Sequence, residues 1–193
     1  MTLALHFALR AARARRQIRR LLRDKRGISA VEFAMLLPLM VTLYLGGVEV
    51  SQAIAIDRKV TLLARSLADL VSQASSISNS DSSNILAATA SIVAPYSDEK
   101  LKITVSSVKI DNNGVAKVCW SDTKNGTARA IGSTVTVPAA LNTVNSSLIW
   151  AESEYAYTPA IGYVITGTMN LKDQIYMRPR LSDTVTREGT PSC

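Results

Sequence analysis

Hydrophobic residues gather in one long run near the start of the chain. From Phe33 to Val48, sixteen residues follow one another without a single Asp, Glu, Lys, Arg or His. A helix needs about 20 apolar residues to cross a bilayer, and the flanking residues supply the remainder. The pattern therefore predicts a transmembrane helix over residues 28–50. Pro38 is expected to bend it, because proline removes one intrahelical hydrogen bond.

After this run, hydrophobic residues recur at alternating spacings of three and four. They are Ala53, Ile56, Val60, Leu63, Leu67, Leu70, Ala74 and Ile77. Such spacing forms a narrow stripe along one face of a helix and leaves the other face to charged residues. We therefore expect an amphipathic extension of the helix over residues 51–78. The stripe suits packing on the chain's own domain as well as packing on a partner.

Serine and asparagine dominate residues 72–84, and this composition predicts a break in the long helix. Asn84 is a candidate N-cap for a short second helix over residues 85–93. Pro95 is expected to end that helix, since proline cannot continue one.

From residue 100 onward the period of the hydrophobic positions changes to two, which is typical of strands. The expected strands are 101–110, with a bulge near Ser106 and Ser107, 115–120, 133–137, 148–157 and 174–178. Strands that follow one another across hairpins form an antiparallel sheet, and a helix on one face of it gives an α+β fold. Residues 79–193 are therefore expected to form one small α+β domain.

Charge is distributed unevenly along the chain. Residues 1–26 hold nine basic side chains and one acidic one, which gives this segment a formal charge of +8. The whole chain has a formal net charge of +7, so the remainder carries −1. The positive-inside rule predicts that residues 1–27 form a basic cytoplasmic leader and that the C-terminal domain crosses the membrane. Because the remainder is not basic, we expect no nucleic acid partner.

The junction between leader and helix carries a short motif. Gly27 is followed by Ile28, and a single carboxylate, Glu32, lies within the apolar segment just before Phe33. A secretory signal has its small-residue cleavage site after the apolar region, whereas here the small residue precedes it. Cutting after Gly27 would leave the helix attached to the mature chain.

This motif resembles the cleavage site of type IV prepilins. Residues 24–73, with KRGISAVEFAMLLPLMVTLYLGGVEV and RSLADLVSQ, are similar to the TadE-like minor pseudopilins of the tight-adherence (Flp) pilus system. The resemblance implies a pilin-like outer domain, cleavage between Gly27 and Ile28 by a prepilin peptidase, and a pilus-assembly role in the bacterial inner membrane. It further implies that Glu32, next to Phe33, pairs with the terminal amine of a neighbouring subunit.

The implied partners are the prepilin peptidase, other pilins or pseudopilins, the inner-membrane assembly platform and membrane lipid. Two alternatives stay open. Glu32 can instead reach back to the cytoplasmic headgroups. The chain can also be a single-pass inner-membrane protein with an uncleaved basic tail and a periplasmic domain that binds a ligand or a partner.

The sequence offers little enzymatic chemistry. Its one histidine, His6, lies in the leader, so the mature chain lacks the histidine of a Ser-His-Asp or Cys-His set. Glu152 and Glu154 point the same way on a strand, and solubility explains such a pair better than catalysis does. We expect no enzyme activity, no cofactor, no metal site and no small-molecule substrate.

The two cysteines, Cys119 and Cys193, are candidates for a disulfide. An oxidising compartment outside the cytoplasm would permit the bond. The alternative is a buried free Cys119 and a frayed Cys193, because spacing alone does not bring two Cα atoms together.

Overall fold

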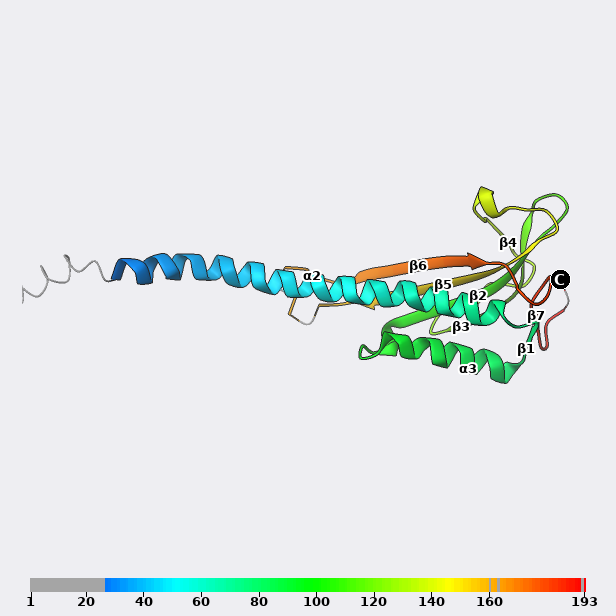
Figure 1. Cartoon of the computed structure of the whole chain (residues 1–193), viewed down its shortest axis with the longest axis horizontal. Helices are drawn as coiled ribbons and strands as arrows, with labels where there is room; N and C mark the ends of the chain where they lie inside the picture. Colours follow the sequence, from blue (N-terminus) through cyan, green and yellow to red (C-terminus); the bar gives the residue numbers. More distant parts are fainter. Residues whose placement is uncertain (1–26, 160, 163, 192) are drawn as a thin grey trace, which may run out of the picture. The chain divides into compact units, whose positions relative to one another are not determined.

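The computed structural model describes residues 27–159, 161, 162, 164–191 and 193. The chain divides into two units, residues 1–47 and 48–193. Of the basic leader predicted for residues 1–27, all but Gly27 lies outside the described residues. A long helix is followed by an antiparallel sheet with a second helix, which confirms the predicted α+β class (Figure 1).

Helix α2 runs without interruption from Ile28 to Ser72, so the apolar segment and the amphipathic stripe belong to one helix of 45 residues. Pro38 lies inside it, and Thr42 Oγ1 donates a hydrogen bond of 2.8 Å to the Pro38 carbonyl. The bend at Pro38 stays a prediction.

The helix breaks within the Ser/Asn-rich residues 72–84, as predicted, and so it does not extend to residue 78. It ends at Ser72, and Ser76–Ile77 form strand β1, which pairs in parallel with β7 (Thr186–Arg187). Ile77 is buried as the stripe predicted, but it reaches the core from a strand. The serine-rich sequence favours this ending, because serine hydroxyls compete with the helical backbone.

The second helix begins earlier than expected. Helix α3 spans Asn79–Ala90, and Ser78 caps it in a box that it forms with Asp81. A capping box satisfies two exposed backbone donors at once, so it outweighs Asn84, which lies inside the helix. A short 3-10 turn, η2 (Ser91–Val93), follows and stops before Pro95.

Five strands form the main sheet in the order β4-β3-β2-β5-β6, and every pairing is antiparallel. Their bounds are β2 Leu101–Ile110, β3 Ala116–Lys124, β4 Thr134–Val135, β5 Ser147–Tyr157 and β6 Met169–Met177. Two 3-10 turns, η3 (Asp98–Lys100) and η4 (Ala139–Leu141), lie between strands. Strand β6 begins at Met169, five residues before the predicted 174.

The bulge lies close to its predicted place but on the partner strand. Ser107 pairs with Trp120 and Val108 pairs with Val118, so Cys119 of β3 is the extra residue. A bulge of this kind breaks the alternation of faces along the strand that carries it. Val118, Cys119 and Trp120 are consequently all buried in succession.

Within residues 48–193, α2 and α3 cover one face of the sheet (Figure 1). The buried hydrophobic side chains of α2 are Ala53, Ile56, Val60, Leu63, Ala64, Leu67, Ala68 and Val71. They meet alternate residues of β2 and β5, such as Ile103 and Ala151, so the stripe packs on the chain's own domain. Leu70 is exposed and Val71 takes its place, because a helix of 3.6 residues per turn drifts relative to a seven-residue repeat.

Candidate functional site

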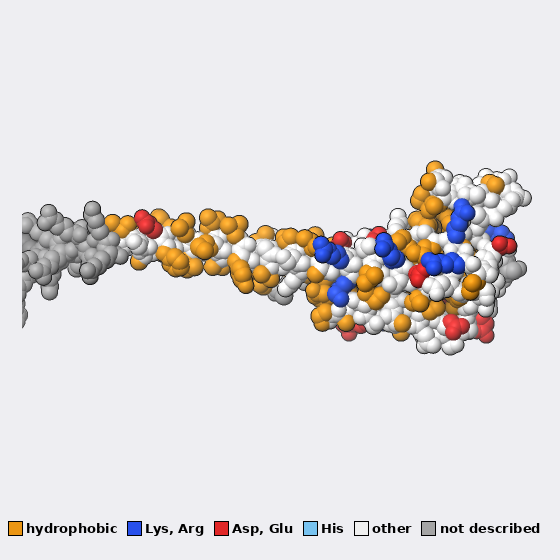
Figure 2. All heavy atoms as spheres, in the orientation of Figure 1, with side chains coloured by type: hydrophobic (Ala, Val, Ile, Leu, Met, Phe, Trp, Pro, Cys, Tyr) orange, Lys and Arg blue, Asp and Glu red, His pale blue; other side chains and the backbone are white. Residues whose placement is uncertain are grey.

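The first part of α2 exposes a continuous apolar surface. Between Ile28 and Leu43, large hydrophobic side chains such as Met35 and Leu39 are exposed around the helix (Figure 2). By length and composition this helix is apolar enough to cross a membrane, and it is the one such helix among the described residues. An exposed apolar surface of this extent indicates contact with lipid or with other proteins.

The predicted cleavage and pairing residues lie together at the start of this surface. Gly27 precedes the helix, Ile28 is its first residue, and both are exposed. Glu32 follows Ile28 by four residues, so it lies on the same side of the helix about 6 Å further along the axis. Phe33 is exposed beside it. Among the described residues, no side chain pairs with the Glu32 carboxylate.

A second carboxylate, Glu49, is buried in the unit formed by residues 48–193. Its Oε2 accepts hydrogen bonds from the backbone N–H groups of Val164, at 3.1 Å, and Ile165, at 2.8 Å. Its backbone carbonyl accepts one from the Tyr157 hydroxyl at 3.3 Å. Burial and the nearby charge of Glu49 raise the pKa of Tyr157. Sequence reasoning treated Glu49 only as a flank of the apolar run.

The sheet face opposite the helices carries a polar groove of about 590 Å³. Arg129 is its central cation, and its guanidinium carbon lies 3.7 Å from the centre of the Trp150 ring. Trp150 stacks in turn on Tyr176, with ring centres 5.3 Å apart. Burial and the negative charge of Glu152 raise the pKa of Tyr176. Trp150 is buried beneath Arg129, and Tyr176 is half-buried beside it.

Glu152 and Glu154 lie on this same face of β5, as their spacing predicted, and both line the groove. Each has its own cation: Glu152 forms an ion pair with Arg129, and Glu154 with Lys172 at 3.1 Å. General acid–base work by a carboxylate pair needs one group kept protonated and another free. Two separately neutralised carboxylates do not provide that arrangement.

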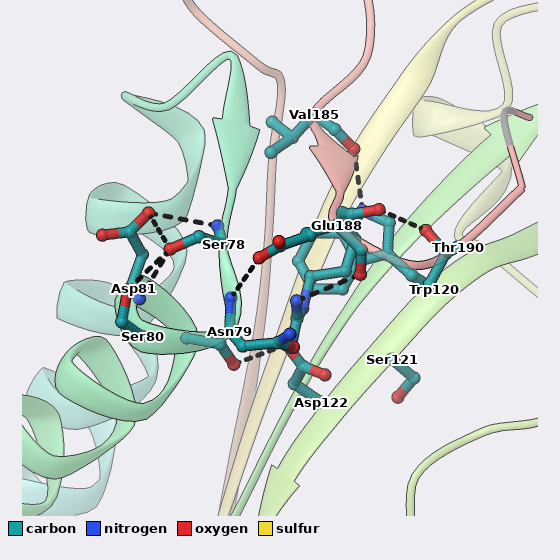
Figure 3. A network of polar contacts seen from close by, with 12 residues as sticks. Ser78, Asn79, Ser80, Asp81, Trp120, Ser121, Asp122, Val185, Glu188 and Thr190 are labelled. Carbon is teal, nitrogen blue, oxygen red and sulfur yellow. Dashed lines mark hydrogen bonds and ion pairs between the residues drawn. The ribbon is translucent and has the colours of Figure 1, made fainter.

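The C-terminal segment is tied to the domain by a polar network (Figure 3). Trp120 Nε1 donates to the Val185 carbonyl at 2.7 Å, and the Asn79 backbone N–H donates to the Glu188 carboxylate at 3.1 Å. A disulfide joins Cys119 to Cys193, with the two Cα atoms 5.3 Å apart. The sequence suggested the cysteine pair but not the polar network.

Comparison with known proteins adds one family. Residues 27–69 match the family model described as TadE-like protein. No curated protein and no solved structure matches the chain. The matched segment contains Gly27, Glu32 and Pro38, together with all but the last turn of the helix that is apolar enough to cross a membrane. Residues 27–69 are thus similar to TadE-like proteins, which suggests a pilus-related protein anchored in a membrane by its apolar helix.

Proposed function

We propose that this chain is a minor pseudopilin of the tight-adherence (Flp-type) pilus system, without enzyme activity, which a prepilin peptidase cuts between Gly27 and Ile28. One observation carries the proposal: the TadE-like segment begins at Gly27 and continues into an exposed apolar helix. A leader cut at this point leaves the helix on the mature protein, where it serves both as membrane anchor and as contact with other subunits.

Cleavage would change the chemistry of the helix start. It would give Ile28 a free amine, while Glu32 carries a carboxylate one turn later on the same side. A charged pair interacts far more strongly in a low-dielectric setting than in water, although desolvation offsets much of that attraction. The Glu32 carboxylate would therefore pair with the terminal amine of a neighbouring subunit and set the axial register between two helices.

The basic leader would hold the N-terminus in the cytoplasm of the inner membrane, and the domain would lie in the periplasm. Its partners would be the peptidase, other pilins or pseudopilins and the assembly platform. The packed helix stripe supports this division of tasks, because the buried face of residues 53–71 is occupied by the domain itself. Contact with other subunits would be made chiefly by the exposed apolar surface between Ile28 and Leu43.

The first test is the intact mass and N-terminal sequence of the protein purified from its native membranes. We expect a chain that begins at Ile28, and the full-length chain in cells that lack the peptidase. A chain that still begins at Met1 in cells with an active peptidase would falsify the processed form. It would favour the alternative, an uncleaved single-pass protein whose outer domain binds a partner at the groove beside Arg129.

A second test separates pairing from folding. Glu32→Gln removes the charge and keeps the shape of the side chain, so we expect cleaved protein, a stable outer domain and fewer or no pili. Glu32→Asp keeps the charge and should restore part of the assembly. Glu99→Gln, on the exposed turn η3, is the matched control and should assemble normally. Normal pilus formation by Glu32→Gln would contradict the pairing role.

A further inference from the structure

The connection between β5 and β6 lacks charged side chains. From Tyr155 to Leu171, seventeen residues follow one another without Asp, Glu, Lys, Arg or His, and this stretch lies outside the TadE-like segment. Loops of a water-exposed domain are usually rich in polar and charged residues. This one instead exposes large aliphatic side chains: Ile161 is 53% exposed and Val164 is 48% exposed.

The described part of this loop is held in place by specific contacts. The hydroxyls of Thr158 and Thr168 lie 3.1 Å apart and close its base. The Glu49 carboxylate accepts hydrogen bonds from the backbone of Val164 and Ile165. Hydrogen bonds to a charged acceptor are among the stronger ones in proteins. Val164 is therefore exposed although the loop that carries it is held to α2 by these hydrogen bonds.

The anchoring residue also gives the position of the loop along α2. Glu49 directly follows the apolar run that ends at Val48, so it marks the place where the helix would leave the hydrocarbon region. Tyr44, which is exposed five residues earlier, is of the amphipathic aromatic type that is enriched at membrane–water interfaces. When α2 is embedded as far as Val48, a loop bonded to Glu49 is held next to the point where the helix leaves the hydrocarbon region.

We propose that the β5–β6 loop is a second membrane contact, in which Ile161 and Val164 enter the interfacial region of the bilayer beside α2. The occupant is lipid, because the loop is apolar, is free of charge and is bonded to the helix where the helix emerges. Such a contact would fix the domain against the membrane surface in addition to the single helix. The proposal goes beyond a role in pilus assembly and requires only that α2 is embedded in the membrane.

The test uses the full chain in vesicles of phosphatidylethanolamine and phosphatidylglycerol, with and without brominated acyl chains that quench tryptophan fluorescence. Ile161→Trp and Val164→Trp report on the loop. Val144→Trp is the matched control: Val144 is 52% exposed and lies beyond the other end of β5, roughly 35 Å away at about 3.3 Å per residue. Leu39→Trp, inside the apolar segment, is the positive control. The parent chain gives the background of Trp120 and Trp150.

We expect quenching of the added tryptophan at 161 and 164 to be at least twofold greater than at 144. The loop contact would be overturned if the tryptophan at 39 is quenched while those at 161 and 164 are quenched no more than the one at 144. This outcome would leave the membrane anchor and the pilus role standing. Absence of quenching at 39 as well would overturn the anchor, and the proposed function with it.

An added tryptophan could itself disturb the loop, so a second measurement uses the chain without substitution. The methyl groups of Ile161 and Val164 in a nanodisc that contains spin-labelled lipid should relax several times faster than those of Val144. Equal relaxation at the three positions would overturn the proposal.

Discussion

Arg187 Nε lies 2.8 Å from Asp122 Oδ2, and this ion pair connects the short strand β7 to β3 across 65 positions of sequence. Only 11% of the Arg187 side chain and 21% of the Asp122 side chain is exposed. Asp122 also accepts a hydrogen bond from Ser82 of α3. One carboxylate thus joins the sheet, the second helix and the C-terminal segment.

Removal of one member of this pair should be costly. Arg187→Gln leaves the largely buried Asp122 carboxylate with one partner fewer. We expect the free energy of unfolding to fall by about 2–3 kcal/mol, less than the roughly 3–5 kcal/mol lost when a fully buried pair is broken. Chemical denaturation in detergent micelles measures it. The control is Arg180→Gln, whose pair with Asp69 is far more exposed and should be worth less than about 1 kcal/mol. Equal effects of the two variants would contradict this ranking.

The Cys119–Cys193 disulfide should stabilise the domain strongly. The cysteines are 74 positions apart, and the loop-entropy model gives about 4 kcal/mol for a loop of this length. Cys193→Ser should lower the midpoint of unfolding and make the C-terminal segment more sensitive to proteases. Cys119→Ser should behave alike, and the reductant sensitivity of the parent should vanish in both. An unchanged midpoint in the variants would contradict the prediction.

Glu49 should hold the β5–β6 loop in place. Glu49→Ala leaves two backbone donors without their acceptor. It should lower the free energy of unfolding by about 1.5–3 kcal/mol, the range for hydrogen bonds to charged groups. Glu49→Gln keeps an acceptor and should cost less. Hydrogen exchange provides the local measurement, because the amides of Val164 and Ile165 should exchange faster while those of β2 do not. Unchanged exchange at both amides would contradict the contact.

The capping box of α3 should make part of the stability depend on acid. Hydrogen bonds from the Ser78 side chain and backbone lower the pKa of Asp81. A lowered pKa in the folded state adds stability above about pH 4, and that part is lost as the pH falls further and the carboxylate takes up a proton. Unfolding measured between pH 6 and pH 3 should show a shallower acid decline in Asp81→Asn than in the parent. Asp57→Asn, exposed on α2, should keep the parent's decline.

Local patterns in the sequence were enough to predict α2 and most of the sheet. The apolar run, the helical stripe and the alternation in β2 each depend on neighbouring residues. The motif from Gly27 to Phe33 could be recognised in the sequence for the same reason, since all its residues are contiguous. The Ser/Asn-rich composition of residues 72–84 likewise predicted the end of the helix at Ser72. Strand β1, which occupies the end of the predicted extension, pairs with a strand 110 positions away, and no local pattern reports such a pairing.

The contacts of Glu49 and of Asp122 could not be predicted. Glu49 binds backbone donors 115 and 116 positions later in the chain, and backbone N–H groups have no side-chain signature. The bulge at Cys119 illustrates a finer limit. The hydrophobic pattern of β2 indicated an irregularity, but the extra residue is on β3, where three buried residues in a row were equally compatible with a regular central strand.

Helix α2 supplies core residues to the domain from Ala53 to Val71, and the unit to which they belong begins at Val48. The boundary predicted at residue 79 would therefore divide a hydrophobic core. A transfer of the outer domain of this chain to another anchor therefore has to cut inside the helix, near Gly47 and Val48. The unit that can be moved as a whole in this chain is the sheet together with the second half of α2, and the segment that matches the TadE-like family model, residues 27–69, is divided by that cut.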